Sequence, residues 1–350
     1  MKPFFLLAVV FLLVFACAPT PAQTPPGLPP SSTNTAAPSV IPPPADSVAL
    51  SRGVNLGNML EAPTEGEWGL FVQEEYFDLI QDAGFDFVRL PVRWNTHAEA
   101  DWPYTIDPAF FARVDEVVNW ALERDLTIIV DFHHYEEMAW DPWSHKDRFL
   151  GIWEQVAEHY KDYPPTVLFE LLNEPNDQLD AALWNGYVSE ALAIVRETNP
   201  TREVVIGPVW WNAYDWVSTL DVPDDGHIIV TFHYYLPFEF THQGAEWAGD
   251  EAAGWLGTTW GSEADKAELV SRFDLVAAWA KRKNVRILLG EFGVYHRADM
   301  TERARWTAFV REQAEARGFA WAYWEFGSGF GAYDPEAREW REELLRALIP

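Results

Sequence analysis

The sequence predicts an α/β protein built on a single (β/α)8 barrel, also called a TIM barrel. Within residues 47–350, eight short apolar runs rich in strand-forming residues alternate with amphipathic helical patterns. The runs are apolar at odd and even positions alike, which is typical of parallel strands covered by helices. Eight such strands in about 300 residues fit a closed barrel better than an open sheet. No Gly-x-Gly-x-x-Gly fingerprint follows the first run, so the pattern does not indicate a nucleotide-binding open sheet.

The elements follow one another without a second linker, which predicts one domain over residues 47–350. The expected strands are residues 54–57, 87–92, 128–133, 167–172, 204–209, 228–235, 287–292 and 320–326. Helical patterns occupy residues 74–83, 108–124, 149–159, 179–198, 266–283 and 301–317.

The N-terminal segment predicts export. Lys2 is followed by an apolar run over residues 4–16, which is shorter than the roughly 20 residues that cross a bilayer but suits a signal peptide. The sequence Val14-Phe15-Ala16-Cys17 resembles a bacterial lipobox, in which the cysteine receives a lipid. We therefore expect a signal peptide over residues 1–16 and a lipid on Cys17. Ordinary signal cleavage nearby, with secretion, is the alternative.

Residues 17–46 are expected to form a disordered tether, because the ten prolines between residues 18 and 46 leave no apolar face to bury. The protein would then be extracellular or anchored at the cell surface, and it would touch the membrane only through Cys17.

Charge and composition exclude several function classes. The formal net charge of −29 repels nucleic acid and anionic lipid. The 19 tryptophans and an aromatic content of 15% exclude disorder for most of the chain. With a single cysteine, no intramolecular disulfide can form. We expect a monomer that binds no nucleic acid.

Polar residues end nearly every expected strand. Because barrel enzymes carry their chemistry at the carboxyl ends of the strands, these residues predict an active site at one mouth of the barrel. They are Asn55, Asn58, Arg89, Asp131, His133, His134, Asn173, Glu174, His233, Tyr235, Glu291, Trp324 and Glu325.

Two carboxylates stand out within this set. Glu174 and Glu291 each end an apolar run, so both are expected to be partly desolvated and near one another. Like charges at close range push the two pKa values apart. One protonated and one ionised carboxyl group are what glycoside hydrolysis requires. The pair therefore predicts a glycosidase.

The sequences Asn173-Glu174-Pro175 and Gly290-Glu291-Phe292-Gly293 resemble the two signature motifs of glycoside hydrolase family 5. The resemblance covers residues 50–348, with further similar blocks at residues 53–58, 89–91, 233–235 and 322–326. It is close to small single-domain endoglucanases of thermophilic bacteria. The resemblance implies a retaining endo-β-1,4-glucanase, or cellulase, that acts on β-linked polysaccharide or oligosaccharide.

The same resemblance implies a role for each site residue. Glu174 would be the acid/base and Glu291 the nucleophile, with carboxyl groups about 5–5.5 Å apart. Arg89 and Tyr235 would hold Glu291 ionised, and His233 would lie beside Glu174. Asn173 would bond the sugar 2-hydroxyl, and the remaining sugar contacts would come from His133, His134, Trp324, Asn58, Glu61 and Glu325.

Three alternatives stay open from the sequence. The substrate of the same mechanism could be β-mannan, because glucan and mannan differ in the orientation of one hydroxyl. The protein could also be a non-hydrolytic sugar-binding lipoprotein, but that class usually has two lobes and does not require a carboxylate pair. A metal site could involve Asp131, His133 and His134, but adjacent strand residues point to opposite faces, so we expect neither a metal nor another cofactor. Tryptophans in expected loops are candidates for cleft walls, namely Trp210, Trp211, Trp247, Trp255 and Trp260.

Overall fold

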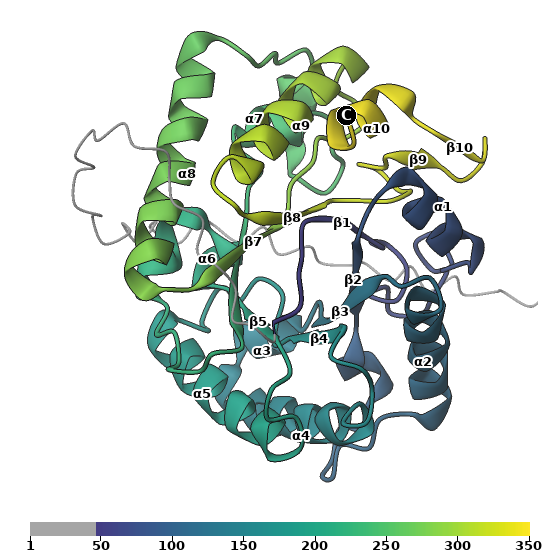
Figure 1. Cartoon of the computed structure of the whole chain (residues 1–350), viewed down its shortest axis with the longest axis vertical. Helices are drawn as coiled ribbons and strands as arrows, with labels where there is room; N and C mark the ends of the chain where they lie inside the picture. Colours follow the sequence, from purple (N-terminus) through teal and green to yellow (C-terminus); the bar gives the residue numbers. More distant parts are fainter. Residues whose placement is uncertain (1–46) are drawn as a thin grey trace, which may run out of the picture.

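The computed structural model describes residues 47–350, in which eight parallel strands close into a barrel (Figure 1). Each strand pairs with the next along the chain and β8 pairs with β1, so the predicted (β/α)8 barrel is confirmed. The strands are β1 (Arg52–Asn55), β2 (Phe87–Val92), β3 (Thr127–Phe132), β4 (Val167–Glu170), β5 (Val204–Ile206), β6 (Ile228–His233), β7 (Arg286–Glu291) and β8 (Ala320–Tyr323). The expected signal peptide, Cys17 and the tether lie outside the described residues.

Several strands end before their predicted carboxyl ends. β4 ends at Glu170 rather than at residue 172, and β8 ends at Tyr323 rather than at residue 326. The residues beyond remain apolar because they are buried under loops, as Leu172 and Phe326 are. Their backbone is no longer part of the sheet, and an apolar run in the sequence does not show where a strand ends.

Long helices surround the barrel (Figure 1). They are α1 (Glu75–Ala83), α2 (Pro108–Leu122), α4 (Pro142–His159), α5 (Ala181–Thr198), α8 (Glu263–Lys283), α9 (Met300–Glu315) and α10 (Glu342–Leu348). Several begin at a residue whose side chain accepts from a backbone N–H of the first turn. Asp107, Asp141, Asp180 and Asp299 do so for α2, α4, α5 and α9, and Ser262 begins α8 with a capping box.

Short elements fill the other connections. They are η1 (Trp94–His97), α3 (Glu136–Trp140), α6 (Val209–Asn212), η2 (Tyr214–Thr219), α7 (Phe238–Thr241) and η3 (Asp250–Trp255), with a small sheet of β9 (Tyr333–Asp334) and β10 (Glu339–Trp340). Most of them follow the carboxyl ends of strands, where they build the rim of the barrel mouth. Among residues 47–350, no helix is both long and apolar enough to cross a membrane.

Apolar side chains fill the interior at the amino end of the strands. The cluster consists of Phe87, Ile129, Leu168, Val205, Ile229, Leu288, Ala320 and Ala322. β1 contributes Gly53, where a Cβ would lie 2.3 Å from the ring of Phe87, so glycine makes room for that ring. Val48 and Leu50 pack against the cluster from outside. This end of the barrel is therefore closed, and the site lies at the other end.

A polar layer lies directly above the apolar cluster. Because side chains alternate along a strand, the next inward positions are Asn55 on β1, Arg89 on β2, Asp131 on β3 and Glu170 on β4. All four side chains are fully buried. Buried charges must be paired, so this layer fixes the positions of the groups above it.

Candidate active site

Arg89 lies at the centre of the mouth and contacts three carboxylates. Its Nε and Nη2 donate to the two oxygens of Glu170 at 2.7 and 2.9 Å. Nη2 also pairs with Asp131 at 3.0 Å, and Nη1 pairs with Glu291 at 2.8 Å. The planar guanidinium presents these donors in a fixed fork. Arg89 therefore ties the buried polar layer to Glu291, and Glu170 has the cationic partner that its burial requires.

Glu291 faces the mouth because of an irregularity in the sheet. The register of β6 and β7 shifts so that His233 pairs with Glu291, which leaves Gly290 as an extra residue. A Cβ at Gly290 would lie 2.4 Å from Oγ1 of Thr231, so glycine is required for this arrangement. Tyr235 donates to Oε2 of Glu291 at 3.0 Å, while Arg89 occupies Oε1. Both carboxylate oxygens of Glu291 are thus held.

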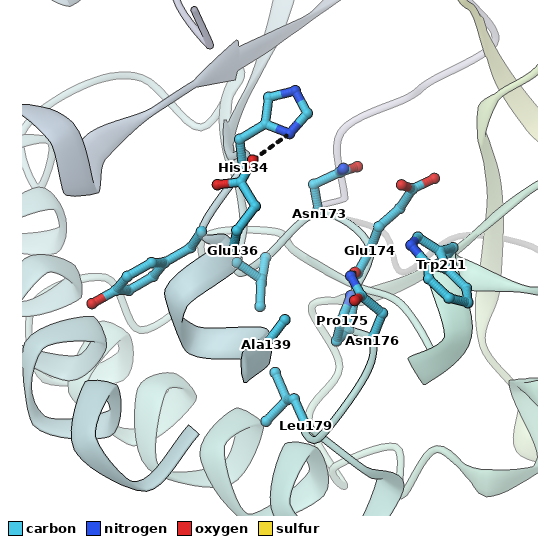
Figure 2. Close-up of a pocket in the computed structure, with 11 residues that line it drawn as sticks. His134, Glu136, Ala139, Asn173, Glu174, Pro175, Asn176, Leu179 and Trp211 are labelled. Atoms are coloured by element: carbon cyan, nitrogen blue, oxygen red, sulfur yellow. Dashed lines mark hydrogen bonds and ion pairs between the residues drawn. The ribbon is translucent and has the colours of Figure 1, made fainter. Parts of the chain in front are cut away.

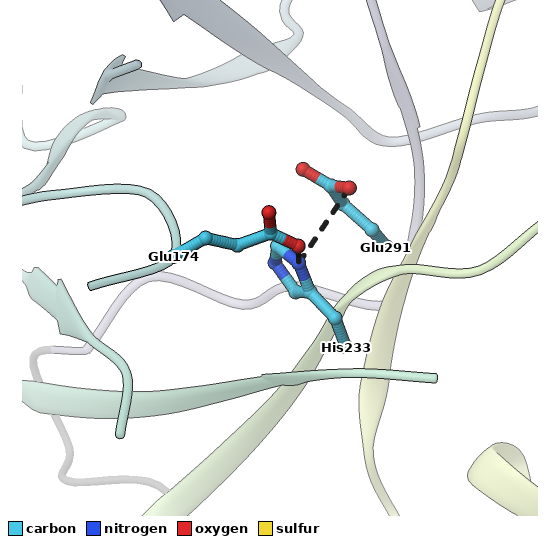
Figure 3. Close-up of side chains that lie close together, drawn as sticks. All are labelled: Glu174, His233 and Glu291. Carbon is cyan, nitrogen blue, oxygen red and sulfur yellow. Dashed lines mark hydrogen bonds and ion pairs between the residues drawn. The ribbon is translucent and has the colours of Figure 1, made fainter. Parts of the chain in front are cut away.

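Glu174 follows β4 in a turn with φ of 50°, which directs its side chain toward the mouth. Asn173, the preceding residue, accepts from Nη2 of Arg89 at 2.8 Å. Oε1 of Glu174 lies 2.7 Å from Nδ1 of His233 (Figure 3). The side chain of Glu174 is 26% exposed and that of Glu291 is 6% exposed, so Glu174 is the carboxyl that opens more widely to the cleft.

Burial raises the pKa of both Glu174 and Glu291, in each case to about 7. Arg89 opposes the effect of burial in both groups, and the two groups differ in their direct contacts. Arg89 and Tyr235 contact Glu291 directly and favour its ionised form. Glu174 has no direct cationic contact, and burial lowers the pKa of its neighbour His233 to about 4, so that ring is neutral. These contacts favour the ionised form of Glu291 over that of Glu174.

His133 and His134 lie just beyond β3 and reach the site in different ways. His133 is buried, bonds Asp131 through Nδ1, and stacks on Trp324 with ring centroids 5.6 Å apart. His134 has a φ of 55°, and its ring meets Trp68 edge-on at 5.5 Å. The expectation that the two histidines face opposite sides of the sheet is wrong, because their rings meet edge-on with centroids 4.5 Å apart. β3 ends at Phe132, so strand alternation does not apply to them.

A cavity of about 250 Å³ opens beside Glu174 (Figure 2). His134 and Glu136 line it on the β3 side, Asn173 and Glu174 follow β4, and Trp211 belongs to α6. Trp211 is 51% exposed. The cavity combines an aromatic face with hydrogen-bonding groups next to the more exposed carboxyl, which suits a sugar ring.

Three predicted sugar contacts, Asn58, Glu61 and Glu325, lie in the supporting loops of the site. Glu61 is buried and accepts from the backbone N–H groups of Asn58 and Met59. Glu325 is buried and accepts from those of Ser328 and Phe330, while its Oε2 has no partner. Burial raises the pKa of Glu61 to about 7 and that of Glu325 to about 8. Their roles toward a sugar stay predictions.

The predicted cleft-wall tryptophans divide between the cavity, the surface and the core. Trp211 lines the cavity, and Trp247 is 62% exposed beside Tyr295. Trp260 is buried against Phe309, so its assignment to the cleft wall is wrong. Trp68 and Asn212 lie beside site residues but are not among the predicted ones. Asn212 sits in the core beside His233, and neither its residue type nor its spacing distinguishes it from an ordinary loop asparagine.

Glu174, His233 and Glu291 also offer one potential metal-ligand atom each, all within 4.8 Å of one another (Figure 3). All three already have protein partners: His233 faces Glu174, while Arg89 and Tyr235 hold Glu291. The distance between the two carboxyl groups is also related to the stereochemistry of a glycosidase. Inverting enzymes hold these groups about 6.5–9.5 Å apart, and retaining enzymes hold them about 5–5.5 Å apart.

Comparison with known proteins agrees with this geometry. Residues 51–329 match the model of the cellulase family, glycosyl hydrolase family 5. Endoglucanase H of Acetivibrio thermocellus is 41% identical over 306 residues, which cover 86% of this chain and 33% of that protein. This chain thus spans about a third of the length of that curated relative. Endoglucanase A of Ruminococcus albus is 30% identical over 335 residues, covering 86% of this chain and 90% of that protein.

Solved structures give the same result. Cel5A of Thermotoga maritima, in a complex with mannotriose, is 48% identical with a TM-score of 0.84, and the match covers 86% of this chain and 97% of that one. A complex of the same enzyme with cellobiose matches equally well. Since the family model spans most of the barrel and the motifs around Glu174 and Glu291 lie at its mouth, the chain belongs to glycosyl hydrolase family 5, the cellulase family.

Proposed function

We propose that this chain is an endo-β-1,4-glucanase that cleaves with retention of anomeric configuration. The observation that carries the proposal is the unequal treatment of two neighbouring carboxyls. Glu291 has both oxygens held by Arg89 and Tyr235, whereas Glu174 faces a neutral His233 and the open cavity. Glu291 is thus prepared as an ionised nucleophile and Glu174 as a proton donor.

The reaction has two steps. First, a carboxylate oxygen of Glu291 bonds to the anomeric carbon, the bond from that carbon to the leaving oxygen breaks, and Glu174 gives its proton to that oxygen. Then a water molecule gives a proton to Glu174 and its oxygen bonds to the anomeric carbon, which releases Glu291. Each carboxyl returns to its starting protonation state, so no further reactant is required.

The sugar contacts are proposed from the free polar and aromatic groups around the pair. The side-chain oxygen of Asn173 accepts from Arg89, which turns its amide N–H group toward the sugar 2-hydroxyl. Trp324, backed by the ring of His133, offers a stacking face for the sugar upstream of the cleaved bond, and His134 adds a polar edge. Asn58, Glu61 and Glu325 support the loops of the same subsite.

The stereochemical test is proton NMR during hydrolysis of cellopentaose. A retaining enzyme releases the β-anomer first, and the α-anomer then appears by mutarotation. Release of the α-anomer first would overturn both the retaining mechanism and the roles of Glu174 and Glu291.

Substrate preference is proposed as glucan, with β-mannan as the alternative because Cel5A has been solved with both mannotriose and cellobiose. We expect the highest rates on carboxymethylcellulose and barley β-glucan, lower rates on glucomannan and galactomannan, and none on laminarin. A higher rate on galactomannan than on barley β-glucan would favour the mannanase. Binding without release of reducing ends would favour the sugar-binding lipoprotein.

We further propose that the protein is exported and anchored by a lipid on Cys17, on the basis of the apolar run and the lipobox-like sequence. Expressed in a bacterial host, the full chain should partition into the detergent phase, and Cys17→Ala should move it to the aqueous phase. Detergent partitioning that survives Cys17→Ala unchanged would contradict lipid anchoring.

A further inference from the structure

Three consecutive residues between β5 and β6 adopt the left-handed backbone conformation. Trp210, Trp211 and Asn212 have φ values of 62°, 58° and 53°. This conformation is costly for residues other than glycine, although asparagine tolerates it better than most. Strained backbone of this kind persists where its surroundings fix it, and it is concentrated at functional sites. The turn places the side chain of Asn212 in the core, where it is fully buried.

The buried amide of Asn212 meets the ring of His233. Nδ2 of Asn212 lies 3.3 Å from Nε2 of His233. The backbone supports the contact, because Ala213 forms a parallel bridge with His233. Gly207 supplies the space on the other side, since a Cβ there would lie 2.1 Å from Oδ1 of Asn212. The amide is thus enclosed between Gly207 and the histidine ring.

The carboxyl groups at the opposite edge of the His233 ring decide which ring nitrogen carries the proton. Nδ1 of His233 lies 2.7 Å from Oε1 of Glu174 and 3.5 Å from Oε2 of Glu291. A proton on Nδ1 is favourable whenever either carboxyl is ionised, whereas a lone pair there would be repelled. Because burial keeps this ring neutral, Nε2 is then a bare acceptor, and Asn212 supplies its donor. The other ionisable groups acting on the ring are Arg89, Glu170 and His133.

We propose that Asn212 is a positioning residue: its amide N–H holds Nε2 of His233 as an acceptor, so that Nδ1–H always donates to Oε1 of Glu174. The inference rests on the proposed role of Glu174. With Oε1 occupied as an acceptor, the catalytic proton resides on Oε2, from which it reaches the leaving oxygen. In the opposite tautomer, Nδ1 would accept the proton of Glu174 in a hydrogen bond and withhold it from the substrate.

The tautomer can be observed directly in the full chain labelled with 15N-histidine. Long-range 1H–15N correlation distinguishes protonated from bare ring nitrogens, and the signals of His233 are identified by their loss in His233→Gln. We expect a protonated Nδ1 and a bare Nε2. A protonated Nε2 with a bare Nδ1 in the unsubstituted protein would overturn the proposal, whatever the enzyme cleaves.

Two substitutions test the consequence for catalysis, and both residue types suit a positive φ. Asn212→Asp places an acceptor against Nε2 and should draw a proton to it, which the NMR experiment would detect. Asn212→Gly removes the donor without straining the turn, and it carries the test if Asn212→Asp does not fold. Asn185→Asp is the matched control, because Asn185 bonds Thr219 and Asp221 away from the site.

The kinetic readout compares two substrates through kcat/KM, which reports the glycosylation step. Cellotetraose needs the acid, whereas dinitrophenyl β-cellobioside has a leaving group that departs without it. We expect Asn212→Asp to reduce kcat/KM on cellotetraose by roughly 100-fold, the lower range of general acid catalysis, and to change it little on the aryl substrate. Equal losses on both substrates, or no loss on either, would contradict the positioning role. If the unsubstituted protein cleaves neither substrate, the proposed function fails, and the tautomer is still decided by NMR.

Discussion

Nη1 of Arg89 donates to Oε1 of Glu291 at 2.8 Å, and both side chains are withdrawn from solvent. The same guanidinium binds Glu170 with two parallel hydrogen bonds and pairs with Asp131. One cation therefore compensates three buried carboxylates. Its removal should affect stability and catalysis together.

Arg89→Ala should lower the free energy of unfolding by about 3–5 kcal/mol, because it leaves buried carboxylates without their partner. Urea denaturation followed by tryptophan fluorescence measures this change. Arg338→Ala is the control: Arg338 is 68% exposed and pairs with Glu75, so its loss should leave the free energy of unfolding nearly unchanged. Equal costs for the two substitutions would mean that the cluster does not stabilise the fold.

Substitution of the two carboxyls should separate their roles. Glu291→Ala should abolish turnover on every substrate, because no glycosyl-enzyme can form. Glu174→Ala should retain glycosylation by dinitrophenyl β-cellobioside but accumulate the intermediate, since the base for its hydrolysis is missing. Azide should then restore turnover and yield the β-glycosyl azide, which NMR identifies. Formation of the α-azide by Glu174→Ala would contradict these assignments, because it would identify Glu174 rather than Glu291 as the nucleophile.

The fold could be predicted because the buried strands of a parallel barrel appear in the sequence as apolar runs. The site could be predicted because the catalytic residues of such a barrel lie at the carboxyl ends of its strands. Arg89, Asn173, Glu174, His233, Tyr235 and Glu291 all meet at one mouth for this reason. Prediction failed where the backbone leaves regular geometry. His133 and His134 were assigned to opposite faces because the end of β3 at Phe132 has no local signal.

Loop positions were the least predictable. Trp211 and Trp260 are both tryptophans in irregular segments, yet one lines the cavity and the other is buried against Phe309. Asn212 depends on a left-handed turn and on the absence of a side chain at Gly207, five residues earlier. Such a contact arises from tertiary packing alone, so no pattern in the sequence indicates it.

Tyr235→Phe should shift the pH dependence of kcat/KM on one side only. The hydroxyl donates to Glu291, and this bond favours the ionised nucleophile. Without it, the pKa of Glu291 rises and protonation removes the nucleophile at a higher pH. A hydrogen bond to a charged group contributes about 1.5–3 kcal/mol, so the acidic limb should move up by about 1–2 pH units.

The alkaline limb of this profile reports loss of the proton that Glu174 carries, and it should stay in place. Tyr187→Phe, which removes only a bond to the carbonyl of Pro142, serves as the control. A shift of the alkaline limb alone would contradict the assignment of Tyr235 to Glu291.

Glu325→Gln should make the protein more stable at alkaline pH. Burial raises the pKa of Glu325 to about 8, so the folded state prefers the protonated carboxyl. The stabilisation by the protonated Glu325 carboxyl is fully present below the pKa of this group in the unfolded chain, and it is lost as pH rises through about 8. Between these two pKa values, the free energy of unfolding falls by on the order of 1 kcal/mol for each pH unit. Glutamine keeps an oxygen for the N–H groups of Ser328 and Phe330 and never ionises. The difference in melting temperature between Glu325→Gln and the unsubstituted protein should therefore grow from pH 5 to pH 8.5. Glu99→Gln, at an exposed position, is the matched control. A constant difference across this range would mean that Glu325 does not titrate with folding.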